Sequence, residues 1–205
     1  MAEKIKENAL SLNISNFPWA DCTIEENRVM YISDSLSLKR SKRNTGIHRY
    51  EFELVTIDID LKEGRSVKAK LSAAVDDTLM FIHPRLSYSA GTEPAAGIFA
   101  SGNQAAGVKT IQMWNSTSQW QLFAGDYIQF SNDTKVYEVS EDTLLQNGVQ
   151  NVKLTSQLRN PIIGNSRVTV NGVTWHLTSN GVIEASMQSD NNQDIQITLV
   201  AVEKL

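Results

Sequence analysis

The side chains best suited to acid–base or metal chemistry near neutral pH are the three histidines. They stand at His48, His83 and His176, and such wide separations lack the paired spacing of a zinc site. The single cysteine, Cys22, rules out an internal disulfide framework and a multi-cysteine metal site. Spacing alone leaves a Ser-His-Asp arrangement open, but no Gly-x-Ser-x-Gly elbow is present. We therefore expect a protein that is not an enzyme and has no catalytic residue, no metal and no cofactor.

Two segments approach ligand-binding motifs without matching them. Residues 102–110 come close to a phosphate-cradling loop, but Val108 displaces the lysine by one place, and the following residues favour a strand rather than a helix. Residues 58–64 carry carboxylates at alternate positions, yet a calcium loop needs an acid where Lys62 stands and a glycine where Glu63 stands. We interpret the first as an ordinary loop and the second as a solvated strand end.

The strongest local charge lies in residues 39–43, where four of the five positions are basic. Such a run could hold phosphate. No aromatic side chain is interleaved with it, so we favour a solvated hairpin tip. The formal net charge of −4 also argues against a dedicated duplex-binding protein.

Aromatic side chains gather in the middle of the chain. Exposed aromatics on a small β-barrel stack on sugars or bases, but a barrel of about 75 residues also needs large side chains to fill its core. Both roles are open from the sequence, and Trp120, in its Ser- and Gln-rich setting, is the one that we expect to be exposed. The candidate ligand contacts are Trp114, Trp120, Tyr127 and Tyr137.

The stretch at residues 125–139 predicts how the last two of these aromatics are positioned. Ile128 and Phe130 share one face of a strand that also carries Tyr127, and a second β-prone run surrounds Tyr137. The polar residues between the two runs predict a turn. Short strands are expected at residues 108–114, 127–131, 135–139 and 149–155, and their spacing is typical of a small all-β barrel or β-sandwich.

The segment before this barrel predicts part of a separate β-rich body. Alternating patterns at residues 28–38 and 49–60 indicate long strands with a change of register. Residues 64–77 have a helical period, with Ser66 as the expected N-cap. Residues 78–84 have the composition of a buried strand.

The segment after the barrel predicts closing strands. The Asn-Gly dipeptide at 171–172 separates two β-prone runs, residues 167–170 and 173–177, and is the strongest short hairpin signal in a sequence. A last strand is expected at residues 194–202. Trp175 lies in this hairpin, and we expect it in the core of the body.

Composition places the domain boundaries. A crossing rich in glycine and alanine follows residue 88, and Pro161 marks the return, so we divide the chain into residues 1–87, 88–165 and 166–205. The amino terminus carries charges where a signal peptide needs an apolar run, and no stretch approaches about 18 apolar residues. We expect folding in the cytoplasm of a cell and no membrane insertion.

The order of these elements resembles the distal tail proteins of long-tailed phages, in the form that carries an inserted oligonucleotide/oligosaccharide-binding (OB) barrel. The resemblance rests on Gly125 and Asp126 before a strand, a polar turn, the run Lys135-Val136-Tyr137, and residues 168–175 before the closing strands. The implied fold is mainly β, with a discontinuous body of sheets plus one helix and an inserted small OB-like β-barrel.

The resemblance implies a structural, non-enzymatic virion protein of the siphophage tail tip or baseplate. In that family a ring, sixfold as a rule, joins the tail tube protein to the tail-tip hub protein, and a host-surface saccharide is a further expected partner. The alternative from a different class is a carbohydrate- or nucleic-acid-binding module that acts through the barrel. A hydrolase ranks third.

Overall fold

The computed structural model describes the backbone of residues 11–34, 40–187 and 194–204, and the side chains of these ranges outside 29–34, 40–47 and 187. The fold is mainly β with one helix, as the sequence predicts. The chain divides into two compact units. The first, which we call the body, comprises Met1–Glu26, Tyr50–Phe81 and His176–Lys204, and the second comprises Asn27–Arg49 and Ile82–Trp175.

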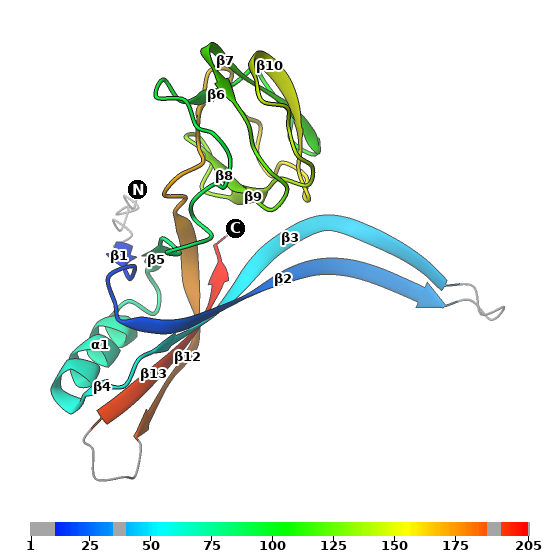
Figure 1. Ribbon diagram of the computed structural model, residues 1–205. Helices are drawn as coiled ribbons and strands as arrows, with labels where there is room; N and C mark the ends of the chain where they lie inside the picture. The colour runs from blue at the N-terminus through cyan, green and yellow to red at the C-terminus, as the bar shows by residue number, and fades with distance from the viewer. Residues whose placement is uncertain (1–10, 35–39, 188–193, 205) are drawn as a thin grey trace, which may run out of the picture. The chain divides into compact units, whose positions relative to one another are not determined.

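The body is built on a seven-stranded sheet with the order β1-β5-β12-β13-β3-β2, and with β4 beside β13 (Figure 1). Its strands come from both ends of the chain, so the body is discontinuous in sequence. The strands of this sheet are β1 (Ser11–Asn13), β2 (Trp19–Asp34), β3 (Arg40–Thr56), β4 (Ile59–Asp60), β5 (Thr78–Phe81), β12 (Trp175–Met187) and β13 (Asp194–Glu203). Residues 27–34 of β2, residues 40–49 of β3 and Trp175 at the start of β12 fall in the second unit.

One face of this sheet forms the core of the body. Alternate residues along β13 are buried, and in the antiparallel register Leu199 lies opposite Leu54 and Ala201 opposite Phe52. All four side chains are at most 1% exposed. A period of two therefore places one complete apolar set on the same side of neighbouring strands.

The helix α1 (Leu61–Ala73) begins three residues earlier than predicted. Asp60, not Ser66, is its N-cap, because its carboxylate accepts from the backbone N–H groups of Lys62 and Glu63 at 2.8 and 3.1 Å. Gly64 is therefore inside the helix, where an added Cβ would lie 1.8 Å from the side chain of Ile195 on β13. The glycine allows the helix to pack closely on the sheet.

The second unit contains a six-stranded, fully antiparallel sheet with the order β10-β7-β6-β11-β8-β9. The sheet curls until its two edges meet, where Val139 bridges Leu154 and the N–H of Thr155 donates to the carbonyl of Glu138 at 2.9 Å. Its strands are β6 (Ile98–Ala100), β7 (Thr110–Trp120), β8 (Tyr127–Phe130), β9 (Val136–Glu138), β10 (Gln146–Lys153) and β11 (Arg167–Thr169). We refer to these strands as the barrel.

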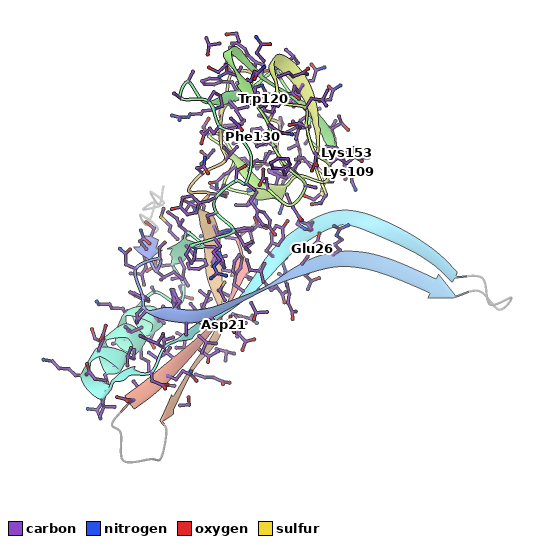
Figure 2. All side chains as sticks on the ribbon, in the orientation of Figure 1. Asp21, Glu26, Lys109, Trp120, Phe130 and Lys153 are labelled. Carbon is purple, nitrogen blue, oxygen red and sulfur yellow. The ribbon has the colours of Figure 1, made fainter. Side chains whose placement is uncertain are left out.

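The barrel has a hydrophobic core of its own. Trp120 and Phe130 point into it and are at most 1% exposed (Figure 2). The pairing of β8 with β9 confirms the two strands and the turn predicted at residues 125–139. The remaining large members of the core are Ile98, Ile111, Met113, Leu122, Ile128, Tyr137, Val139, Val152, Leu154, Leu158, Ile162, Val168 and Val170.

The hairpin predicted at residues 167–177 is wrong. β11 pairs with β6 and β8 of the barrel, whereas β12 pairs with β13 of the body. The dipeptide only bends the chain, with a φ of 76° at Gly172, and the Gly172 N–H donates to the distant carbonyl of Ser87 at 2.8 Å. The two flanking strands leave this bend for different sheets, and the second unit ends at Trp175 rather than at residue 165.

Some of the remaining predictions are confirmed by the structure and others are not. Trp175 is fully buried, as predicted, but it belongs to the second unit rather than to the body. The crossing after residue 88 contains β6, which has no strand signal in the sequence, and a register shift inside β12 includes Gly181. Of the basic run at residues 39–43, Lys39 lies outside the described residues. Within the described ranges, no helix is both long and apolar enough to cross a membrane.

Residues 82–175, produced as a separate polypeptide, should fold. All six barrel strands and their core lie inside this segment. A dispersed amide NMR spectrum is the expected result, and Trp120→Ala should lower the stability of the segment by about 3–5 kcal/mol. A shorter segment, 88–165, lacks β11 and should be unfolded. If residues 88–165 folded as well as residues 82–175, β11 would not be required for the barrel to fold.

Candidate functional site

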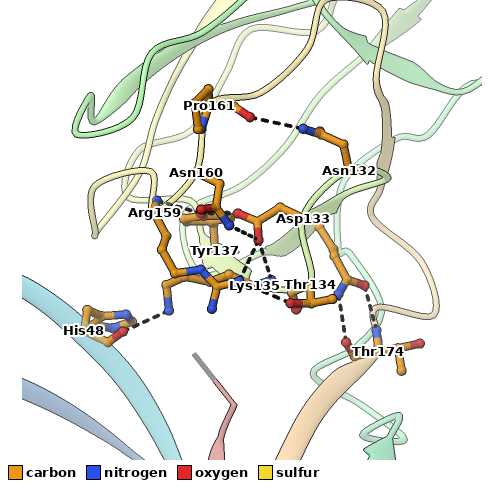
Figure 3. Close-up of polar contacts among 11 residues, drawn as sticks. His48, Asn132, Asp133, Thr134, Lys135, Tyr137, Arg159, Asn160, Pro161 and Thr174 are labelled. Carbon is orange, nitrogen blue, oxygen red and sulfur yellow. Dashed lines mark hydrogen bonds and ion pairs between the residues drawn. The ribbon is translucent and has the colours of Figure 1, made fainter. Parts of the chain in front are cut away.

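The densest group of polar contacts surrounds Asp133, in the turn between β8 and β9 (Figure 3). Its carboxylate is fully shielded from solvent. One oxygen, Oδ1, accepts from the Arg159 guanidinium at 2.9 Å and from the Asn160 amide at 3.2 Å. The same oxygen accepts from the backbone N–H of Lys135 at 3.2 Å, and Oδ2 accepts from the Tyr137 hydroxyl at 2.7 Å. We call these five residues the Asp133 cluster.

Tyr137 is fully buried within this cluster. Its hydroxyl donates to Asp133 and also accepts from the backbone N–H of Arg159 at 2.9 Å. Burial of the phenol raises the pKa of Tyr137 far above its usual value, an effect that the N–H of Arg159 opposes and the hydrogen bond to Asp133 strengthens. The phenol therefore stays protonated and is a hydrogen-bonding group, not a general base.

The Asp133 cluster fastens one segment of the chain to another. Arg159 also donates to the hydroxyl of Thr134 at 3.2 Å, and the side-chain amide of Asn132 donates to the carbonyl of Pro161 at 3.1 Å. The loop that follows β10 is thereby tied to the β8–β9 turn. Both carboxylate oxygens already accept hydrogen bonds, so the cluster is structural in character rather than an acid–base site.

Elsewhere the polar groups are poorly placed for catalysis or metal binding. The ring Nδ1 of His83 accepts from the backbone N–H groups of Arg85 and Leu86, at 3.1 and 2.8 Å. Burial, together with the nearby Asp21, raises the pKa of the Cys22 thiol to about 12, which leaves it protonated and unreactive. Among the described residues, no group of three or more His, Cys, Asp or Glu side chains could hold a metal ion.

A hollow of about 120 Å³ on the body offers no better chemistry. It lies where β2, β3 and β13 meet, and the carboxylates of Glu25, Glu51 and Glu53 line it beside Val200. A hollow of this size holds a few water molecules at most. Its lining has acids but no nucleophile paired with a base.

The four aromatic candidates do not come together. Trp120 is fully buried, and its indole N–H donates to the carbonyl of Gly148 at 3.3 Å. Its predicted exposure is wrong because the Ser and Gln residues beside it describe the surface of β7, whereas Trp120 itself faces the core. Tyr137 belongs to the Asp133 cluster. Tyr127 packs edge-on against Trp175, with ring centroids 5.2 Å apart.

Trp114 is the one candidate that belongs to a solvent-facing group on the barrel. On the outer face of the sheet it lies opposite Phe99 of β6 and opposite Val149 of β10. Arg167 of β11 lies opposite Phe99 and extends the row to a fourth strand. We call Arg167, Phe99, Trp114 and Val149 the outer strip. Only the cross-strand register reveals it, because no motif connects residues so far apart in sequence.

Removing the charge of Asp133 should destabilise the protein strongly. Asp133→Asn places an amide N–H₂ where donors converge and leaves Arg159 without its counter-charge, at a cost of about 3 kcal/mol in urea unfolding. The control is Glu141→Gln, which breaks the exposed contact between Glu141 and Lys153 and should cost less than about 1 kcal/mol. Similar losses from both substitutions would contradict the fastening role.

His83 should make stability fall in mild acid. Burial, assisted by repulsion from Arg85, lowers the pKa of His83 below 6.5 in the folded state. The unfolded chain then takes up the proton first, so this contribution is complete above pH 6.5 and is lost as the pH falls toward the lowered folded-state pKa. His83→Asn, which keeps an acceptor for the turn, should reduce the drop in melting temperature between about pH 7.5 and about pH 5. An unchanged drop would contradict this.

No protein-family model and no curated protein matches this chain.

Proposed function

We propose that this chain is a structural, non-enzymatic protein of a phage virion, the distal tail protein at the tail tip. In this role it forms a ring, sixfold as in the family that its sequence resembles, between the tail tube protein and the tail-tip hub protein. The observation that carries the proposal is the order of its parts. A discontinuous β body with one helix is interrupted between β5 and β12 by a β unit that has its own core.

The edge of the body sheet supports assembly into a ring. β2 and β3, of 16 and 17 residues, run side by side as a long two-stranded ribbon, and β2 is the edge strand of the sheet (Figure 1). A long edge strand offers backbone N–H and C=O groups to another chain. Identical subunits that use such an edge head to tail close into a ring when the rotation between them allows it.

The polar chemistry also favours a structural role. The most elaborate group of polar contacts in the described residues, the Asp133 cluster, occupies its carboxylate with internal donors and fastens a loop. The hollow lined by Glu25, Glu51 and Glu53 is small and acidic, and a larger one beside the start of α1 carries Asp60, Lys62, Arg65 and Asp194 with no nucleophile among its lining residues. Stability and a defined shape are what a ring subunit requires, and buried polar networks of this kind rigidify a fold.

The purified protein should assemble into rings, at least at high concentration. Light scattering after size-exclusion chromatography should give a multiple of the 22.8 kDa subunit mass, and electron micrographs should show closed rings. Replacing residues 29–47 with an Asn-Gly turn shortens the ribbon and should abolish the rings while circular dichroism stays β-rich.

The matched control is Val149→Ala, which alters the barrel surface and should leave the rings intact. Monomers at every concentration, with no rings in micrographs, would count against the proposed function. Rings that persist in the shortened variant would instead show that the ribbon is dispensable for assembly.

A further inference from the structure

The outer strip places apolar side chains where a one-sided sheet normally carries polar ones. Val149 is 54% exposed, and Phe99 and Trp114 are half-buried. The two aromatic rings have centroids 6.0 Å apart and planes inclined at 42°. Their neighbours along each strand, such as Ile98 and Met113, point inward and fill the core. The outer strip is therefore not required to fill the barrel.

A guanidinium group lies at one end of the outer strip. Arg167 is exposed and lies over Gly97, where a Cβ added to the glycine would come within 3.2 Å of Nε. The missing side chain at Gly97 thus leaves room for the guanidinium beside Phe99. In the described part of the chain, no carboxylate pairs with Arg167. The N–H groups of the Arg167 guanidinium are therefore available to donate to a bound anion.

The remaining surroundings are polar and uncharged. Gln112 and Asn151, which lie opposite each other in the register of β7 and β10, and Ser116 stand two positions from the apolar members and are exposed. They provide amide and hydroxyl groups that both donate and accept. Two lysines on these strands are already occupied: Lys153 of β10 pairs with Glu141, and Lys109, just before β7, donates to the carbonyl of Thr155.

The combination of two aromatic rings, one guanidinium and uncharged polar side chains favours some classes of ligand over others. A nucleic acid would need several cations along its backbone, because phosphate neutralisation dominates its affinity, and the outer strip supplies one. A phosphate monoester carries nearly two negative charges, more than one guanidinium balances. A carboxylate matches a single guanidinium in charge and in its bidentate geometry. The amide and hydroxyl frame suits a ligand that is otherwise rich in hydroxyl groups.

We propose that the outer strip is a binding site for an acidic saccharide that contains a hexuronate. The C–H face of one pyranose ring lies on Trp114 and Phe99, Gln112 and Asn151 hydrogen-bond the ring hydroxyls, and the carboxylate pairs with Arg167. The site belongs to one subunit and is independent of ring assembly. Because the surface is shallow, binding to a single subunit is weak, with a Kd on the order of 1 mM or somewhat below.

Calorimetric titration of the full chain with trigalacturonate tests the site. One binding event per subunit is expected, and maltotriose, which is neutral, should bind about tenfold more weakly because it lacks the charge-assisted pair. Quenching of tryptophan fluorescence gives a second readout, since Trp120 and Trp175 are fully buried and the signal must come from Trp114 or Trp19. A thymidine oligonucleotide of matched charge should bind no more tightly than maltotriose.

Substitutions identify the surface. Trp114→Ala should abolish the saturable heat of binding. Phe99→Ala is the second variant, for use if Trp114→Ala disturbs the fold, and it should weaken binding. Arg167→Gln, at an exposed position, should remove the preference for trigalacturonate over maltotriose. The control is Tyr88→Ala, which removes an aromatic side chain that is 54% exposed and outside the outer strip, and it should leave the Kd unchanged.

Four results would overturn the proposal. They are no saturable binding of trigalacturonate, equal affinity for maltotriose, tighter binding of the oligonucleotide, or the same loss from Tyr88→Ala as from Trp114→Ala. None of them bears on ring formation, which light scattering measures separately.

Discussion

The barrel strands and β3, β5, β12 and β13 of the body each bury one face among their described residues, and that face has to meet a core on its own side of the sheet. The constraint is clearest at the bend that contains Gly172. Val168 and Val170 before the bend belong to the core of the barrel, whereas Leu177 after it is buried in the body. Residues 168–177 therefore contribute to two cores. The boundary between the two units lies where the buried side chains stop packing in the barrel and begin packing in the body.

Polar groups inside the barrel reinforce the arrangement that apolar burial establishes. Removing a carboxylate from water is costly unless it is fully hydrogen-bonded, and Asp133 meets this condition through four donors from two segments of the chain. Gln150 acts in a similar way, since its amide accepts from the N–H of Leu144 and donates to the carbonyl of Trp120. Such networks fix loops that have few apolar contacts, and they hold the fold in a single shape.

The same kind of side chain has different roles on the two faces of the barrel. Trp120 fills the interior and satisfies its indole N–H internally, so no part of it is available to a ligand. Trp114, on the same strand, faces outward with Phe99 and Val149 as cross-strand neighbours. The inward side chain contributes stability, and the outward one contributes recognition if the proposed saccharide site is real. The two contributions would not compete, because they occupy opposite sides of one sheet.

The sequence by itself determined the mainly β character, the single helix, the β8–β9 pair and the burial of Trp175, because these depend on local periodicity and turn residues. It did not determine the partner of β11 or the existence of β6, since strands of three residues carry almost no pattern. The exposure of Trp120 and the membership of the outer strip were likewise decided by the tertiary structure. Which residues face each other across a sheet depends on register between distant segments, and no local signal records that register.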